Sequence, residues 1–155
     1  MIAQQALYEV LISRLRNASP LWGVRVEPLT TASSRLGAPG ADGKRKLYVV
    51  FFEVSGGANK VNPHRKNAEF VISVKAVGGD MANVMAASAV ISTLLDESGR
   101  QDVGSEAANP HLPIHADWDV TTITEDRDIW LEELFSGAES IYHAGHQYQV
   151  NMEKK

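Results

Sequence analysis

The sequence predicts an α+β domain with one mostly antiparallel β-sheet, two main α-helices packed on one face of it, and long flexible loops. Two segments, residues 2–17 and 80–98, carry apolar residues at helical spacing. Several other segments alternate apolar and polar residues or are dense in β-branched and aromatic residues. A chain of 155 residues, of which 44% are hydrophobic, is long enough to bury one core. We therefore expect residues 1–155 to form a single domain.

The first elements are a helix and a short strand. In residues 2–17, Leu7, Leu11 and Leu15 form an apolar stripe typical of an amphipathic helix. Pro20 prevents this helix from continuing. The next segment alternates Trp22, Val24 and Val26 with polar residues, which predicts a strand ending at Pro28. Residues 30–46 show no apolar period and are rich in Ser, Ala, Gly and Pro, so we expect a long loop.

Two long strands are expected next. Residues 47–54, LYVVFFEV, are apolar on both faces, which favours the middle strand of the sheet. Residues 69–77 alternate apolar and polar side chains, as in a strand with one buried face. Because only the basic connection 55–67 separates them, we expect the two strands to be antiparallel neighbours.

The second half contains the main helix and further strands. Gly78 and Gly79 break the preceding strand, and Asp80 can cap the helix over residues 80–98, which we expect to stop at Gly99. A polar loop over residues 100–116 leads to a strand around Trp118, Val120 and Thr122. Residues 125–137 fit either an edge strand or a short helix. We favour the helix because Leu and Glu dominate. Residues 141–152 predict a final strand.

Charge is distributed unevenly along the chain. Residues 35–66 hold seven basic and two acidic residues, an excess of five positive charges, whereas residues 96–139 hold twelve acidic residues and two arginines. Such separation favours association with further copies of the chain or with a charged neighbour, although two solvated loop regions would give the same pattern. The predicted contact residues are Lys44, Arg45, Lys46, Lys60, Arg65 and Lys66.

Several classes of protein lack support in the sequence. There is no cysteine, so neither disulfides nor a cysteine-ligated zinc is available, and cytosolic production is the natural expectation. Neither a secretory leader nor a membrane span is recognisable, so we expect a soluble protein without a membrane partner. No phosphate-binding glycine motif or nucleophile elbow is present, so we expect neither a cofactor nor an enzyme. With a net charge of −4 and no reading motif, sequence-specific nucleic-acid binding is not expected.

One cluster offers an enzymatic alternative. His111, His115, Asp117 and Asp119 could form the site of a small metal-dependent enzyme, since imidazole and carboxylate are ligands of zinc and iron. We do not favour this alternative, because Pro110 and Pro113 indicate a kinked loop and the two histidines lack helical four-residue spacing. For His143 and His146, we favour a surface turn around Gly145 over a metal site.

The order of the parts resembles the tail terminator or tail-completion proteins of long-tailed bacteriophages. The resemblance covers nearly the whole chain and lies in the segments IAQQALYEVLISRLRN, WGVRVEP, LYVVFFEV, EFVISVKAV, DMANVMAASAVISTLL and HQYQVNM. It implies a structural virion protein without an active site, assembled in the host cytoplasm. Such subunits form a homohexameric ring at the head-proximal end of the tail tube, end tube polymerisation and join tail to head.

The resemblance also implies partners. These are further copies of the chain, the tail tube protein and the head–tail connector protein. We expect basic loops of one subunit to meet the acidic segment of the next in a head-to-tail contact. Another phage neck or connector subunit is an alternative with the same sequence features.

Overall fold

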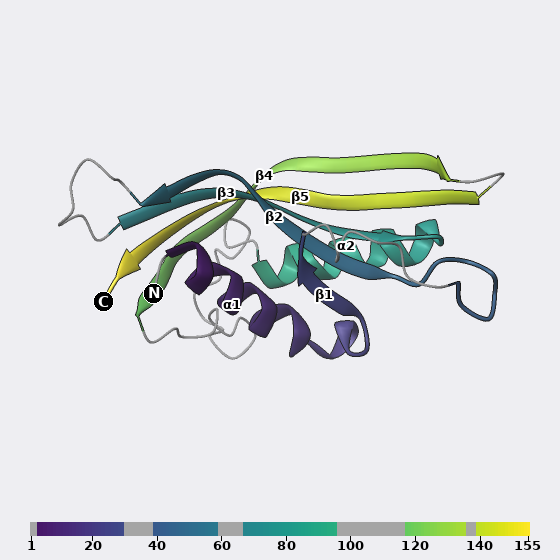
Figure 1. Cartoon of the computed structure of the whole chain (residues 1–155), viewed down its shortest axis with the longest axis horizontal. Coiled ribbons are helices and arrows are strands. Elements are labelled where there is room, and N and C mark those ends of the chain that lie inside the picture. Colours follow the sequence, from purple (N-terminus) through teal and green to yellow (C-terminus); the bar gives the residue numbers. More distant parts are fainter. Residues whose placement is uncertain (1–2, 30–38, 59–66, 96–116, 136–138) are drawn as a thin grey trace.

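The fold is α+β, with one mixed sheet of five strands and two α-helices (Figure 1). The structure, a computed structural model, describes residues 3–29, 39–58, 67–95, 117–135 and 139–155. The elements in chain order are α1 (Ala3–Arg16), the short 3-10 helix η1 (Ser19–Leu21), β1 (Arg25–Pro28), β2 (Tyr48–Ala58), β3 (Asn67–Gly78), α2 (Met81–Leu95), β4 (Trp118–Phe135) and β5 (Glu139–Lys154).

The strands lie in the order β1-β2-β3-β5-β4. β1 pairs with β2 in parallel, whereas β2 with β3, β3 with β5, and β5 with β4 are antiparallel. The predicted antiparallel pairing of β2 with β3 is confirmed. The expectation that β2 lies in the middle is wrong, because β5 pairs along the other side of β3 and makes β3 the central strand. β2 also extends to Ala58, so part of the predicted loop 55–67 is strand.

The predicted helix within residues 125–137 is wrong, because residues 125–135 belong to β4. β4 pairs with β5 without interruption from Arg127, opposite Gln147, to Phe135, opposite Glu139. Two register shifts, between Val120 and Thr122 and between Glu125 and Arg127, precede this regular part. The continuous ladder with β5 therefore outweighs the local helix propensity of Leu and Glu.

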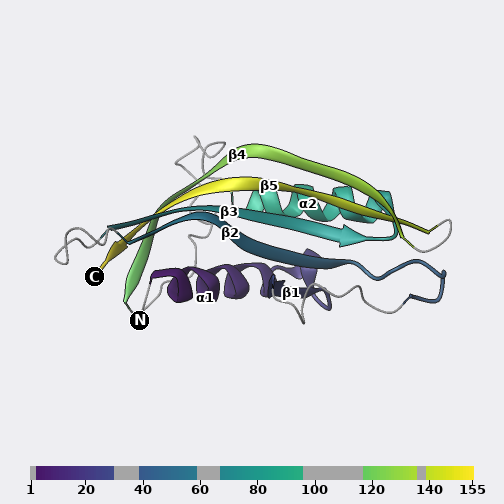
Figure 2. The same cartoon turned by 45° about the horizontal axis from the view of Figure 1, so that its top comes forward.

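The main core joins the two helices to the sheet. Leu7 and Leu11 of α1 and Ile91 of α2 are fully buried in one cluster with strand residues such as Phe51. The Tyr8 ring packs edge-on against Phe51, with ring centroids 5.0 Å apart. Figure 2 shows both helices lying along the sheet. The apolar stripes predicted for these helices are thus the surfaces that they bury.

The predicted cap of α2 is confirmed. Asp80 Oδ1 accepts hydrogen bonds from the backbone N–H groups of Ala82, at 3.0 Å, and Asn83, at 3.3 Å. These are donors of the first turn that have no partner within the helix. The predicted stop at Gly99 lies outside the described residues.

A smaller apolar cluster explains why β2 is apolar at successive positions. Tyr48 and Val50 alternate with core residues of β2, so they project to the opposite side of the sheet and pack with Val77 and Ile141. The Arg25 guanidinium lies 4.6 Å from the centre of the Tyr48 ring. Burial raises the pKa of Tyr48 above its ordinary value, and the positive charge of Arg25 acts in the opposite direction.

Gly145 lies inside β5, so the surface turn predicted around it is wrong. It pairs with Lys75 on β3 and with Ile129 on β4, and it is buried. A methyl group on Gly145 would lie 2.5 Å from Lys75 Cα and still closer to the carbonyl oxygen of Val74. The glycine therefore permits β3 and β5 to approach closely at this point.

Candidate interaction surface

The first part of the surface is a tight turn before β2 that carries Lys44, Arg45 and Lys46. Gly40 N–H donates to the carbonyl of Lys44 at 2.7 Å, and Gly43, with φ of 77°, supplies the left-handed residue of the turn. Lys44 N–H donates to Asp42 Oδ1 at 3.0 Å. These bonds fix the backbone that presents the three basic side chains.

The three basic side chains have different surroundings. Arg45 Nε lies 2.8 Å from Glu139 Oε1 in a half-buried ion pair within the chain. Lys44 Nζ lies 3.7 Å from Asp80 Oδ2, but its side chain is still 55% exposed. Lys46 is exposed. Lys44 and Lys46 are thus available to a partner, whereas Arg45 fastens the turn to the start of β5.

The remaining predicted contact residues, Lys60, Arg65 and Lys66, lie outside the described residues. They follow Ala58, the last residue of β2, whereas Lys46 stands before its first residue. Eleven strand residues, about 35 Å at the usual strand rise, separate the two attachment points. The two basic groups are therefore attached to the chain at opposite ends of β2.

A shallow pocket of about 340 Å³ lies beside the basic turn. Its lining combines Lys44 and Lys46 with Leu47, Asp80 and the exposed Trp22. The sequence suggested that Trp22 belongs to a strand, but in the structure it follows the 3-10 helix η1. Its indole Nε1 donates a hydrogen bond to the carbonyl of Asn17 at 3.2 Å. The pocket offers a partner both positive charge and an apolar ring.

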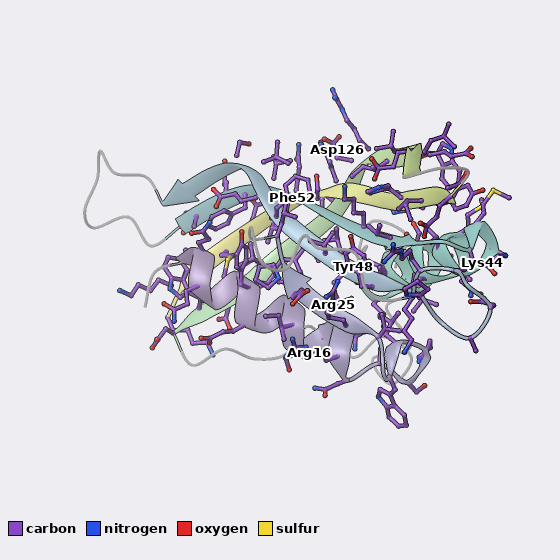
Figure 3. The ribbon with its side chains drawn as sticks, turned by 45° about the vertical axis from the view of Figure 1, so that its right-hand side comes forward. Arg16, Arg25, Lys44, Tyr48, Phe52 and Asp126 are labelled. Carbon is purple, nitrogen blue, oxygen red and sulfur yellow. The ribbon has the colours of Figure 1, made fainter. Side chains whose placement is uncertain are left out.

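The second part of the surface is β4, which forms one edge of the sheet. Asp126, Asp128, Glu132 and Glu133 are exposed along it. In the view of Figure 3, Asp126 lies at the upper edge of the molecule and Lys44 at its right-hand end. Three large apolar side chains are also exposed on β4: Trp130 (50%), Leu131 (48%) and Leu134 (77%). Their exposure was not expected, because the sequence favoured a helix here.

Two histidines fasten β4 to β5. His143 Nε2 lies 2.6 Å from Glu133 Oε1. On the other side of the hairpin, His146 Nδ1 lies 3.0 Å from Glu125 Oε1, and Nε2 lies 3.2 Å from Asp128 Oδ1. The signal in the sequence is the acidic residues at positions 125, 128 and 133. They fall near His143 and His146 once the two segments pair as antiparallel strands. Their evident role is to hold the two strands in register.

The metal site of the enzymatic alternative lies only partly within the described residues. Within them, no group of three or more His, Cys, Asp or Glu side chains could hold a metal ion. Asp119 forms an ion pair with Lys155 at 3.4 Å, and Asp117 is exposed beside it in the chain. His111 and His115 lie outside the described residues.

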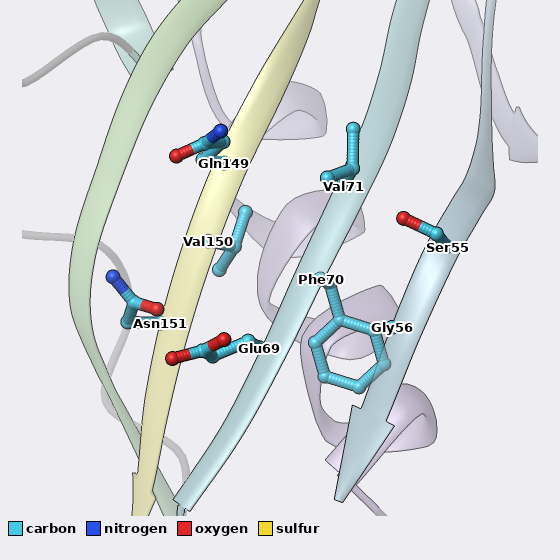
Figure 4. A pocket seen from close by; sticks show the side chains of 8 residues that line it. All are labelled: Ser55, Gly56, Glu69, Phe70, Val71, Gln149, Val150 and Asn151. Carbon is cyan, nitrogen blue, oxygen red and sulfur yellow. The ribbon is translucent and has the colours of Figure 1, made fainter.

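A second shallow pocket lies on the sheet itself (Figure 4). It has a volume of about 230 Å³ and is lined by residues of β2, β3 and β5, including Ser55, Glu69, Gln149 and Asn151. These polar side chains can donate or accept hydrogen bonds, and Glu69 adds one negative charge. The lining holds neither a nucleophile paired with a base nor a cluster of basic groups.

Comparison with known protein families and with curated proteins finds no match. No helix among the described residues has the length and apolar character needed to span a membrane. The function must therefore be argued from the surface alone.

Proposed function

We propose that this chain is a structural subunit of the tail terminator type, which forms a ring at the head-proximal end of a phage tail tube. The observation that carries the proposal is the exposure of opposite charges on separate elements. Lys44 and Lys46 are exposed on the turn before β2, and Asp126, Asp128 and Glu132 are exposed on β4. A subunit with two complementary surfaces can join its neighbours head to tail. Such contacts close into a ring when the rotation that relates successive subunits returns to the first subunit after one full turn.

Two further features support self-association. We infer that α1 and α2 cover the same face of the mostly antiparallel sheet, because both pack with Phe51 and its neighbours in one core. The opposite face and the β4 edge are then available for contact. The exposed Trp130, Leu131 and Leu134 add apolar area beside the carboxylates, as at the centre of protein interfaces.

In this proposal the ring is a homohexamer whose partners are the tail tube protein and the head–tail connector protein. The chain ends tube polymerisation, joins tail to head, and belongs to the virion after assembly in the host cytoplasm. It has no catalytic role. Membrane and sequence-specific nucleic acid are not partners.

The first experiment is to measure the mass of the assembled protein in solution by light scattering and native mass spectrometry. The expected result is a discrete ring, and its addition to purified tail tubes should stop their elongation in electron micrographs. A chain that stays monomeric even with tail tubes present would refute the proposal. A ring that leaves elongation unchanged would instead indicate another neck or connector subunit.

The charge contact is tested by reversal. We expect Lys44→Glu with Lys46→Glu, and separately Asp128→Lys with Glu132→Lys, each to prevent ring formation, because like charges then meet at every contact. Arg45 is left intact because it pairs with Glu139.

Mixing the two variants should restore rings of alternating subunits, since each contact again joins opposite charges. Matched controls are Lys154→Glu and Glu153→Lys, exposed positions at the far end of β5. Rings that form equally well from either variant alone, at low and high salt, would contradict the charge contact.

A further inference from the structure

The two edges of the sheet differ in whether they can accept another strand. β1 is only four residues long and ends at Pro28. Its middle is also covered, because Arg16 Nη2 donates a hydrogen bond to the carbonyl of Val26 at 2.7 Å. Short edge strands, proline and covered carbonyls are ways in which proteins prevent strand addition. The β1 edge is therefore closed.

The β4 edge lacks these protections over half its length. The register shifts of β4 precede Arg127, and the nine residues Arg127–Phe135 then pair regularly with β5 on one side only. This run contains neither proline nor glycine. No described strand pairs with its outer side, so about 30 Å of backbone N–H and C=O groups faces outward there.

The side chains of the run specify the chemistry of a partner strand. Trp130 and Leu134 point to one side of the sheet and Leu131 to the other, so an added strand would meet apolar side chains on both sides. Asp128, Glu132 and Glu133 are exposed on the same run, which holds a single basic residue, Arg127. A strand with basic and apolar residues would find complementary neighbours at cross-strand positions.

We propose that the outer edge of Arg127–Phe135 binds an extended, basic segment of a different protein by strand addition. The described strand edges of a second copy are disfavoured as donors, because its β1 edge is closed and pairing of two β4 edges would bring like charges together. Main-chain hydrogen bonds then supply affinity, and the carboxylates and the apolar side chains select the partner. The inference does not require ring formation. Because the proposed ring contact uses the same β4 carboxylates, the bound segment and a neighbouring subunit would compete for this edge.

The probe is a fluorescein-labelled nine-residue peptide that alternates lysine and valine. We expect its fluorescence anisotropy to rise on binding. A peptide of the same sequence and charge with N-methylated amides lacks the main-chain donors and should bind at least about tenfold more weakly. Backbone hydrogen exchange within residues 127–135 should slow in the presence of the unmodified peptide.

Side-chain selection is tested on the protein. Glu132→Lys should weaken peptide binding about threefold to tenfold, because it replaces a cross-strand attraction with repulsion. The matched control is Glu153→Lys, the same charge change at the far end of β5, which should leave binding unchanged.

Four outcomes would overturn the proposal. Absence of binding, or equal binding of the N-methylated peptide, would exclude strand addition. Equal loss of binding in the two charge variants would show that the peptide responds to overall charge. Because the chain has no cysteine, Glu132→Cys also permits a disulfide test for β4–β4 pairing, and efficient dimer cross-linking would make a second copy the occupant. Ring mass is measured separately, so either proposal can fail alone.

Discussion

Substitution of Gly145 by alanine tests the close approach of the two central strands. The added methyl group would lie 2.5 Å from Lys75 Cα, well inside the usual contact distance, and closer still to the carbonyl of Val74. The obstacle is backbone on a paired strand, so it cannot move away as a flexible side chain does. β3 and β5 would have to separate where both are buried.

The expected cost is that of overpacking a core. We expect Gly145→Ala to lower the free energy of unfolding by about 2–4 kcal/mol. For a chain of this length that corresponds to a melting temperature lower by roughly 5–15 °C. Urea unfolding followed by circular dichroism measures the free energy, and a thermal scan gives the temperature.

The control is Gly43→Ala. Nothing lies within 4 Å of a methyl group at Gly43, so the cost there comes from its φ of 77° alone and is about 1–2 kcal/mol. If Gly145→Ala is as stable as the unsubstituted protein, or no less stable than Gly43→Ala, then β5 adjusts freely and the argument from close approach is wrong.

Three further predictions concern the cap of α2 and two ionisable groups whose pKa is shifted by burial. Asp80→Ala should destabilise the protein by about 1 kcal/mol in urea, whereas Asp80→Asn, which can still cap α2, should not; equal losses would assign the effect to the ion pair with Lys44. Burial lowers the pKa of Lys75, and the negative charge of Glu133 acts in the opposite direction. The charged Lys75 therefore lowers the stability of the folded state at pH values below its folded pKa, and this destabilisation is lost as the pH rises towards 10.5. Lys75→Met should therefore raise the melting temperature at pH 7 and lose this advantage in alkaline solution; a gain independent of pH would contradict this. The raised pKa of Tyr48 means that the unfolded chain ionises first above pH 10.0, so stability falls there, and Tyr48→Phe should flatten the melting temperature measured against pH in that range.

Elements with one buried face were predictable from the sequence. α1, α2 and β5 bury the stripes or alternating positions that their residue periods indicate, and the Asp80 cap follows from local chemistry. In each case the pattern that defines the element is also the pattern of its burial.

The second half of β4 was not predictable in this way. From Arg127 onward, the apolar residues Trp130, Leu131 and Leu134 are exposed. Their spacing therefore does not mark a buried face of the strand. Leu and Glu then suggest a helix, although the ladder with β5 determines the structure. The histidine pairs with Glu133 and Asp128 depend on the same register, which is why they too were missed.

The position of β5 between β3 and β4 governs when the protein can fold during synthesis. β5 is made after the other four strands of this sheet, yet it separates β3 from β4. It pairs with β3 from Tyr142 to Glu153 and with β4 from Glu139 to Lys154. Until Lys154 has left the ribosome, β4 has no partner in the sheet, and core residues such as Phe70 lack their neighbours on β5. The apolar strands of the nascent chain therefore remain exposed and accessible to chaperones until β5 has been synthesised.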